Sequence, residues 1–161
     1  MALDSPEIIE RLGRLEAIEL IRRLIYDYGY YVDLNEPEKL AQLFTADCTA
    51  TYSVGFGAEG IEQYRELVGE IGKYFAGTCH YITNIAVDLV DDSTAEVRAI
   101  VYAWHRYNRD RPDSHWMGYY HNVVVRTDED TWKIRRLEMK TVNMVNHHLR
   151  PDSQIPIGRR E

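Results

Sequence analysis

A histidine and an aspartate that are far apart in the chain have the types and positions needed to move a proton. Asp33 ends the segment that begins at Tyr28, and His80 opens a long run of apolar and aromatic residues. An imidazole beside a carboxylate is a common device for proton transfer near neutral pH. The carboxylate fixes the imidazole tautomer, so that the other ring nitrogen can act as a base. We expect Asp33 and His80 to meet as an acid–base pair.

Two further polar side chains could join this pair. Tyr28 precedes Asp33 by a little over one helical turn, which brings it within loose reach of the same side. His105 lies in the next expected strand, on the face shared by Ala103 and Tyr107. Asp33 also lies at the expected end of a helix, where the helix dipole should raise the pKa of its carboxyl. The alternative interpretation is a turn aspartate and a surface histidine.

Other catalytic chemistries find no matching motif in the sequence. The six histidines show neither HxH nor HxxxH spacing, and the adjacent His147 and His148 would point apart. Cys48 and Cys79 stand alone, without CxxC spacing. There is no GxSxG nucleophile motif and no GxxxxGK[ST] phosphate loop. We therefore expect no metal ion, and the proton chemistry described above requires no cofactor.

Helices must position Asp33. Ser5, Pro6 and Glu7 form a helix start, and apolar residues then recur every three or four positions as far as Val32. Gly13 is expected to interrupt this pattern, which leaves a main helix over about 14–34. Further helices are predicted over 35–44 and 61–75, separated by a short strand over 48–53 and a glycine-rich turn over 55–60.

The second half of the chain reads as strands. Long stretches rich in β-branched and aromatic residues cover 79–90, 94–108, 116–126 and 132–146, with charged turns between them. This order predicts an α+β fold, in which a curved antiparallel (mixed) sheet wraps around the long N-terminal helix as a cone-shaped α+β barrel. Its open mouth would form a small-molecule pocket. We expect one domain over 1–149 and a frayed tail over 150–161.

Composition narrows the classes of partner. The 161 residues are 45% hydrophobic and carry a net charge of −7, with no basic stripe, so nucleic acid is not an expected partner. The N-terminus has no apolar signal-peptide core, and no apolar run reaches the length of a membrane span, so we expect a cytoplasmic protein without a membrane partner. Twelve tyrosines against three phenylalanines suggest strands with a polar inner face.

The order of these motifs resembles a known family. Four segments are similar to the SnoaL-like branch of the nuclear-transport-factor-2-like superfamily. They are the helix ending in Tyr-x4-Asp, the Glu-x2-Lys-Leu-x2-Leu-Phe-x2-Asp segment over 36–47, the His80 strand and the segment from Gly118 to Ile134. The resemblance covers about 10–146. It is closest to a cluster that contains scytalone dehydratase, bile-acid 7α-dehydratase and hexachlorocyclohexane dehydrochlorinase.

This resemblance implies roles for particular residues. Asp33 and His80 match the helix-end aspartate and the strand histidine that removes the substrate proton. Tyr28 matches a tyrosine of the bile-acid enzyme, Tyr52 and His105 match a pocket tyrosine and second histidine of the scytalone enzyme, and Asn122 matches its pocket asparagine. The chloride-site arginine of the dehydrochlorinase aligns near Arg136 or Leu137, which argues against a halide leaving group, and the Asp-Arg-Asp set of epoxide hydrolases is absent.

The resemblance thus implies a cofactor-independent dehydratase or isomerase acting on a hydrophobic, ring-bearing small molecule. The same fold also hosts noncatalytic ligand-binding or assembly modules and polyketide-type cyclases, and these alternatives stay open. Members commonly pair through the outer face of the sheet, where we expect Trp104, Trp116 and Trp132 to supply apolar area. We therefore expect a homodimer or homotrimer.

Overall fold

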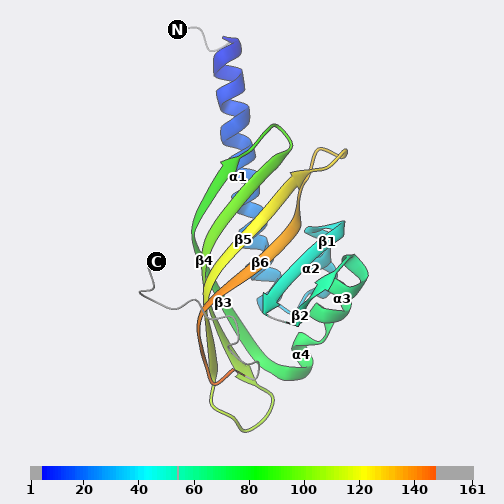
Figure 1. Ribbon diagram of the computed structural model, residues 1–161, viewed down its shortest axis with the longest axis vertical. Coiled ribbons are helices and arrows are strands. Elements are labelled where there is room, and N and C mark those ends of the chain that lie inside the picture. The colour runs from blue at the N-terminus through cyan, green and yellow to red at the C-terminus, as the bar shows by residue number, and fades with distance from the viewer. Residues whose placement is uncertain (1–4, 54, 148–161) are drawn as a thin grey trace.

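A computed structural model of the protein describes residues 5–53 and 55–147, so the predicted tail over 150–161 lies outside the described residues. A mixed sheet curves around one long helix, with shorter helices at its side (Figure 1). In chain order the elements are α1 (Pro6–Asp33), α2 (Pro37–Gln42), β1 (Phe44–Ser53), β2 (Phe56–Glu59), α3 (Ile61–Gly69), α4 (Ile71–Tyr74), β3 (Phe75–Leu89), β4 (Thr94–Tyr107), β5 (Ser114–Arg126) and β6 (Trp132–Val145).

The predicted α+β cone is confirmed. The strand order is β2-β1-β6-β5-β4-β3, in which β1 runs parallel to β6 and every other pair is antiparallel. Register shifts interrupt β3 between Thr83 and Ala86 and β5 between Met117 and Gly118. Such bulges bend a strand and increase its twist, which lets long strands curve around a helix.

The helix α1 is longer than predicted. It continues through Gly13, and its first turns project beyond the sheet (Figure 1). Nothing lies within 4 Å of the position of a Cβ atom at Gly13. The glycine therefore costs only its weak helix propensity, about 1 kcal/mol, which a 28-residue helix tolerates. Deeper in the molecule, Ile21, Ile25 and Tyr28 are buried against the sheet.

Several predicted boundaries were wrong. The strand predicted over 48–53 begins at Phe44, where the preceding helix was expected to end. The helix expected over 61–75 is split into α3 and α4, and Phe75 already pairs with Tyr107 as the first residue of β3. The glycine-rich segment over 55–60 contains the strand β2, which pairs with β1. A Cβ atom at Gly57 would lie 2.2 Å from the carbonyl oxygen of Ala50, so a side chain cannot be accommodated there.

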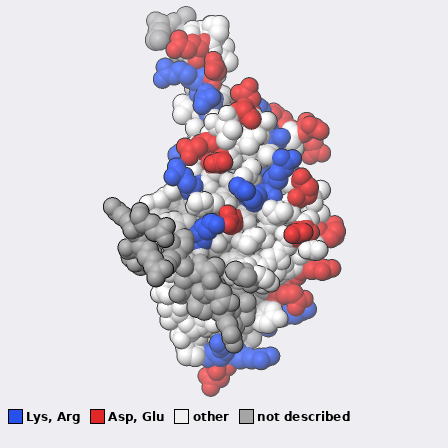
Figure 2. Space-filling model, viewed as in Figure 1, with Lys and Arg blue, Asp and Glu red and all other residues white. Residues whose placement is uncertain are grey.

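The expectation that three tryptophans lie on the outer face was also wrong. Trp116 and Trp132 are buried on the inner face, and Trp104 alone of the three lies on the outer face, where its indole donates a hydrogen bond to Asp113. The exposed apolar residues of the outer face are instead Tyr81, Ile100, Tyr102 and Tyr119. Over the part of the surface visible in Figure 2, acidic and basic side chains lie beside one another along α1 and the upper sheet.

Candidate active site

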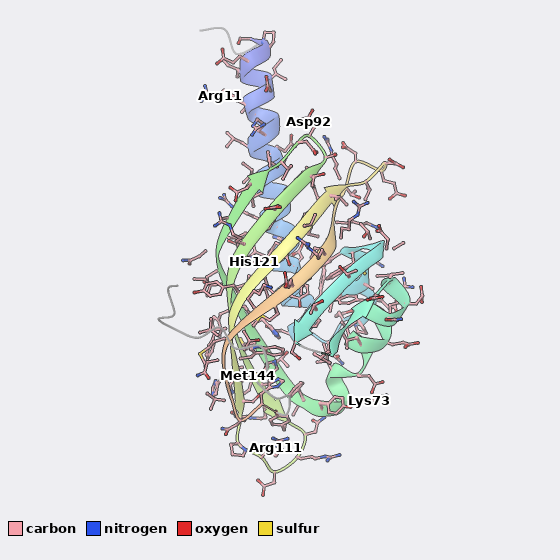
Figure 3. All side chains as sticks on the ribbon, viewed as in Figure 1. Arg11, Lys73, Asp92, Arg111, His121 and Met144 are labelled. Carbon is pink, nitrogen blue, oxygen red and sulfur yellow. The ribbon has the colours of Figure 1, made fainter. Side chains whose placement is uncertain are left out.

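A cavity lies between α1, α3, α4 and the concave face of the sheet. Its volume is about 90 Å³, and it is partly open to solvent. Its walls come partly from α4, the start of β3, and the ends of β4 and β6. The cavity therefore lies at the end of the molecule where Figure 3 labels Lys73, Arg111 and Met144. None of the described residues lining it is lysine, arginine, aspartate or glutamate. The cavity therefore suits an uncharged, mainly apolar ligand.

Asp33 and His80 meet at the wall of this cavity. The last residue of α1 places the Asp33 carboxylate against β3, where Oδ1 is 2.7 Å from Nδ1 of His80. The backbone N–H of His80 donates to Oδ2 at 2.8 Å, and the Thr78 hydroxyl donates to Oδ1 at 2.9 Å. The His80 side chain is 9% exposed and lines the cavity. The predicted contact between the helix end and the strand start is present, with Thr78 as an additional partner.

The carboxyl of Asp33 behaves differently from the sequence-based expectation. Burial acts to raise its pKa, but the hydrogen bonds and charge interaction with His80 and the hydrogen bond from Thr78 hold the pKa below the ordinary 3.8. The predicted upward shift of the Asp33 pKa was wrong, because the interactions with His80 and Thr78 outweigh the effect of burial. An ionised carboxylate only accepts hydrogen bonds, so Nδ1 of His80 carries a proton. Nε2 is then the basic nitrogen available to a molecule in the cavity.

Tyrosine hydroxyls gather at another wall of the cavity. The Tyr28 and Tyr52 hydroxyls are 3.0 Å apart, and the Tyr52 hydroxyl is 3.5 Å from that of Tyr64. Tyr120 packs edge-on against Tyr28, with ring centroids 5.6 Å apart. Burial raises the pKa of all four phenols. The hydroxyls therefore stay protonated, and those of Tyr28, Tyr52 and Tyr120, which line the cavity, can donate hydrogen bonds to an oxygen of a ligand.

Two more histidines reach the cavity. His105, from β4, lies edge-to-face against His80 with ring centroids 5.5 Å apart. His147 follows β6 and lies at the same centroid distance from His105, close to Trp116. Both histidines line the cavity. His105 was expected to share a face with Ala103, and the two do so on the buried side of β4.

Asn122 stands apart from this group. It is buried on the concave face of β5, but it is not among the described residues that line the cavity. Its Oδ1 has no hydrogen-bond partner among the described residues. Of the predicted site residues, the structure thus brings together Tyr28, Asp33, Tyr52, His80 and His105 and leaves Asn122 outside. The catalytic roles of Asp33 and His80 and the substrate-binding roles of the other four residues stay predictions.

Sequence reasoning missed several residues of the site. Tyr120 could have been found, because the period of two that puts Gly118 on the inner face puts Tyr120 there as well. Thr78 shares a face with His80 for the same reason. His147 had no such signal, since a turn after the last strand decides where it points.

A metal centre has no support within residues 5–53 and 55–147. No group of three or more histidine, cysteine, aspartate or glutamate side chains there is arranged to hold an ion. Cys48 and Cys79 are both free thiols. Within the same ranges, no helix has both the length and the apolar character required to span a bilayer.

Comparison with known proteins identifies the family. Residues 13–138 match the SnoaL-like domain, and the chain therefore belongs to the SnoaL-like family, within the nuclear-transport-factor-2-like superfamily. A sequence comparison with curated proteins gave no match.

Several solved structures share the fold. A protein described as a candidate scytalone dehydratase of Novosphingobium aromaticivorans is 40% identical, with a TM-score of 0.84 over 92% of this chain and 98% of that one. A candidate aromatic ring hydroxylase of the same organism is 26% identical, with a TM-score of 0.77 over 83% and 94%. A hexachlorocyclohexane dehydrochlorinase of Novosphingobium barchaimii is 20% identical, with a TM-score of 0.77 over 86% and 94%, which shows a shared fold.

Proposed function

We propose that the protein is a cofactor-independent enzyme, either a lyase of the dehydratase type or an isomerase, that acts on a hydrophobic, ring-bearing small molecule. In both cases Asp33 and His80 would abstract a proton from the substrate. One observation carries this proposal: the 2.7 Å contact between Asp33 Oδ1 and His80 Nδ1 at the wall of an apolar cavity. The 40% identity to a candidate scytalone dehydratase supports the choice of reaction.

The arrangement supports a specific sequence of steps. His80 Nε2 takes the proton next to a ketone of the substrate, and the C–H electron pair forms an enolate. The Tyr28 and Tyr52 hydroxyls donate to the developing oxyanion, and loss of one strong donor of this kind costs about 2.7–4 kcal/mol. When the enolate collapses, the C–O bond at the next carbon breaks, and the departing hydroxyl takes a proton and leaves as water.

Asp33 contributes by orienting the base. Its carboxylate accepts from both the ring and the backbone of His80, which fixes the ring position and the tautomer. In an isomerase the same pair would return the proton to a different carbon. No step requires a cofactor, and the absence of charged groups among the described lining residues matches an uncharged substrate.

Two probes test the proposal. Scytalone contains the hydroxyl that a dehydratase would remove, and its turnover is followed by ultraviolet absorbance of the conjugated product. The bicyclic ketone 2-tetralone has no leaving group, so exchange of its acidic C–H protons for deuterium, followed by NMR, reports proton abstraction alone. We expect the wild-type protein to catalyse both reactions and His80→Ala to lose both.

A matched control separates chemistry from folding. His121 lies exposed on the outer face of β5, labelled in Figure 3, and His121→Ala should keep both activities. If the wild-type protein binds 2-tetralone but catalyses neither reaction, the enzyme proposal is wrong, and a noncatalytic ligand-binding module takes its place.

A further inference from the structure

The residue directly after the last strand is held in a fixed position. Asn146 has a φ of 54°, in the left-handed region, so the chain turns sharply at the end of β6. Two hydrogen bonds hold this turn: the Tyr107 hydroxyl donates to the Asn146 carbonyl at 3.1 Å, and the Asn146 amide donates to the Asp113 carbonyl at 3.3 Å. Continued extension would carry the chain past the rim of the sheet. The turn instead brings His147 to the cavity wall.

The ring of His147 lies among aromatic neighbours that hold it in place. Its centroid is 4.9 Å from that of Trp116 and 5.5 Å from that of His105, with the two imidazoles at 73°. Trp116 is itself fixed, because its indole N–H donates to the buried Thr141 hydroxyl at 2.8 Å. His80, His105 and His147, which all line the cavity, therefore form a row of ring contacts, in which His105 contacts each of the other two at a centroid distance of 5.5 Å.

From this row we infer that His147 is the proton donor to the departing oxygen, an assignment that rests on the proposed function. His80 cannot serve both faces of a substrate at once, because Asp33 fixes its ring. A substrate held between His80 and His147 would lose its C–H proton to the first and receive a proton on its leaving oxygen from the second. His105 contacts both rings.

The protons and bonds balance over one turnover. The C–H bond breaks toward His80 Nε2, its electron pair forms the new C=C bond, and the C–O bond breaks as the imidazolium of His147 protonates the oxygen. Water leaves, His80 holds one extra proton, and His147 lacks one. Loss of the extra proton from His80 to solvent and uptake of one proton from solvent by His147 restore the starting state, since the cavity is partly open.

Two reactions on the same protein test this role. His147→Phe keeps a flat ring against Trp116 and removes both nitrogens, while His147→Gln keeps polarity in a smaller side chain. A general acid contributes about 10²–10⁴-fold. We therefore expect each variant to lower the rate of scytalone dehydration by at least about 100-fold. Deuterium exchange into 2-tetralone should stay within about 2-fold of wild type, because exchange needs the His80 base and the tyrosine donors but no proton donor to a leaving group.

The control is His121→Phe, the same substitution on the outer face, which should change neither rate. Dehydration at the wild-type rate in both His147 variants would overturn the assignment. An equal loss of dehydration and deuterium exchange would also overturn it, because the His147 ring would then only shape the cavity. If both variants fail to fold, as judged by thermal unfolding, the ring is structural and the assignment is wrong. A wild-type protein without exchange or dehydration would instead refute the proposed function itself.

Discussion

Replacing Asp33 with asparagine removes one charge with little change in shape. The carboxylate accepts three hydrogen bonds, two on Oδ1 and one on Oδ2. An asparagine offers one accepting oxygen and one donating nitrogen. If its oxygen faces the ring of His80, its N–H₂ group opposes the backbone N–H of His80. If its nitrogen faces the ring, Nδ1 must become an acceptor, and the proton moves to Nε2. Each orientation breaks an interaction, and the second abolishes the base.

The size of the effect follows from these contacts. A hydrogen bond to a charged group contributes about 1.5–3 kcal/mol, so the loss of one should lower the free energy of unfolding by that amount. For a chain of this length, each kcal/mol shifts Tm by about 2–4 °C, so Tm should fall by roughly 3–12 °C near neutral pH. An asparagine at the orienting position of a hydrolase triad lowers kcat about 10⁴-fold, and we expect a similar loss of scytalone turnover.

The pH dependence identifies charge as the cause. Because the pKa of Asp33 is lowered by folding, the ionised carboxylate stabilises the protein fully above the unfolded value of 3.8. That stabilisation is lost as the pH falls below 3.8 toward the folded value. Denaturant unfolding of wild type and Asp33→Asn should therefore show a gap that is widest near neutral pH and narrows below 3.8.

A carboxylate on the same helix provides the control. Asp27 has the same side-chain exposure as Asp33, 23%, but it pairs with the exposed Arg23 instead of a buried partner. Asp27→Asn should change stability much less and leave turnover intact. A stability gap for Asp33→Asn that stays constant as the pH falls through 3.8 would refute the reasoning. The loss would then come from changed packing at the helix end.

Three other outcomes follow from the structure. Tyr52→Phe should slow scytalone dehydration about 10²–10³-fold. Tyr64 contacts the Tyr52 hydroxyl but is outside the described cavity lining, so Tyr64→Phe should leave the rate unchanged. Equal losses in the two variants would contradict an oxyanion role for Tyr52. Gly118→Ala should lower the free energy of unfolding, measured with denaturant, by more than about 2 kcal/mol, since the new Cβ would lie 2.1 Å from the Lys140 carbonyl oxygen. Gly13→Ala should raise the same free energy by about 0.5–1 kcal/mol, since nothing lies within 4 Å of the new Cβ. We also propose a homodimer or homotrimer through the outer sheet face: light scattering should give a mass above 18.8 kDa for the wild type and a monomer for Ile100→Glu, and a monomeric wild type would refute it.

The pattern of the sequence was sufficient for the core of the site. A helix that ends at Asp33 and a long strand that begins near His80 must lie together if the helix fills the cone, so their contact could be predicted without coordinates. Strand alternation likewise placed His105 on the same face as Ala103 and Tyr107, and the structure shows that this face is buried. These inferences succeeded because they depend only on the period of each element and on which elements meet.

The rest depended on details that local patterns do not contain. The alternation of β5 puts Asn122 on the inner face. The distance from Asn122 to the cavity, however, depends on the bulges that set the curvature of this strand. His147 lies beyond the last strand, where the left-handed turn at Asn146 decides its direction. Trp116 and Trp132 were placed on the wrong face because their aromatic type suggested an interface, while the pairing of β5 with β6 puts them inside.

The energetics of the Asp33 contact help to separate a catalyst from a noncatalytic binding module. Burial of a carboxylate costs free energy, and that cost opposes ionisation of Asp33 even in the folded protein. Thr78 and His80 offset it with hydrogen bonds from three donors, all of which come from the start of one strand. A cavity that only held an apolar ligand would gain affinity from its walls, and an apolar pair at these two positions would serve it without that cost. An oriented imidazole is useful where a proton moves, and the first measurement to make is therefore deuterium exchange, which requires the base and the tyrosine donors but no proton donor to a leaving group.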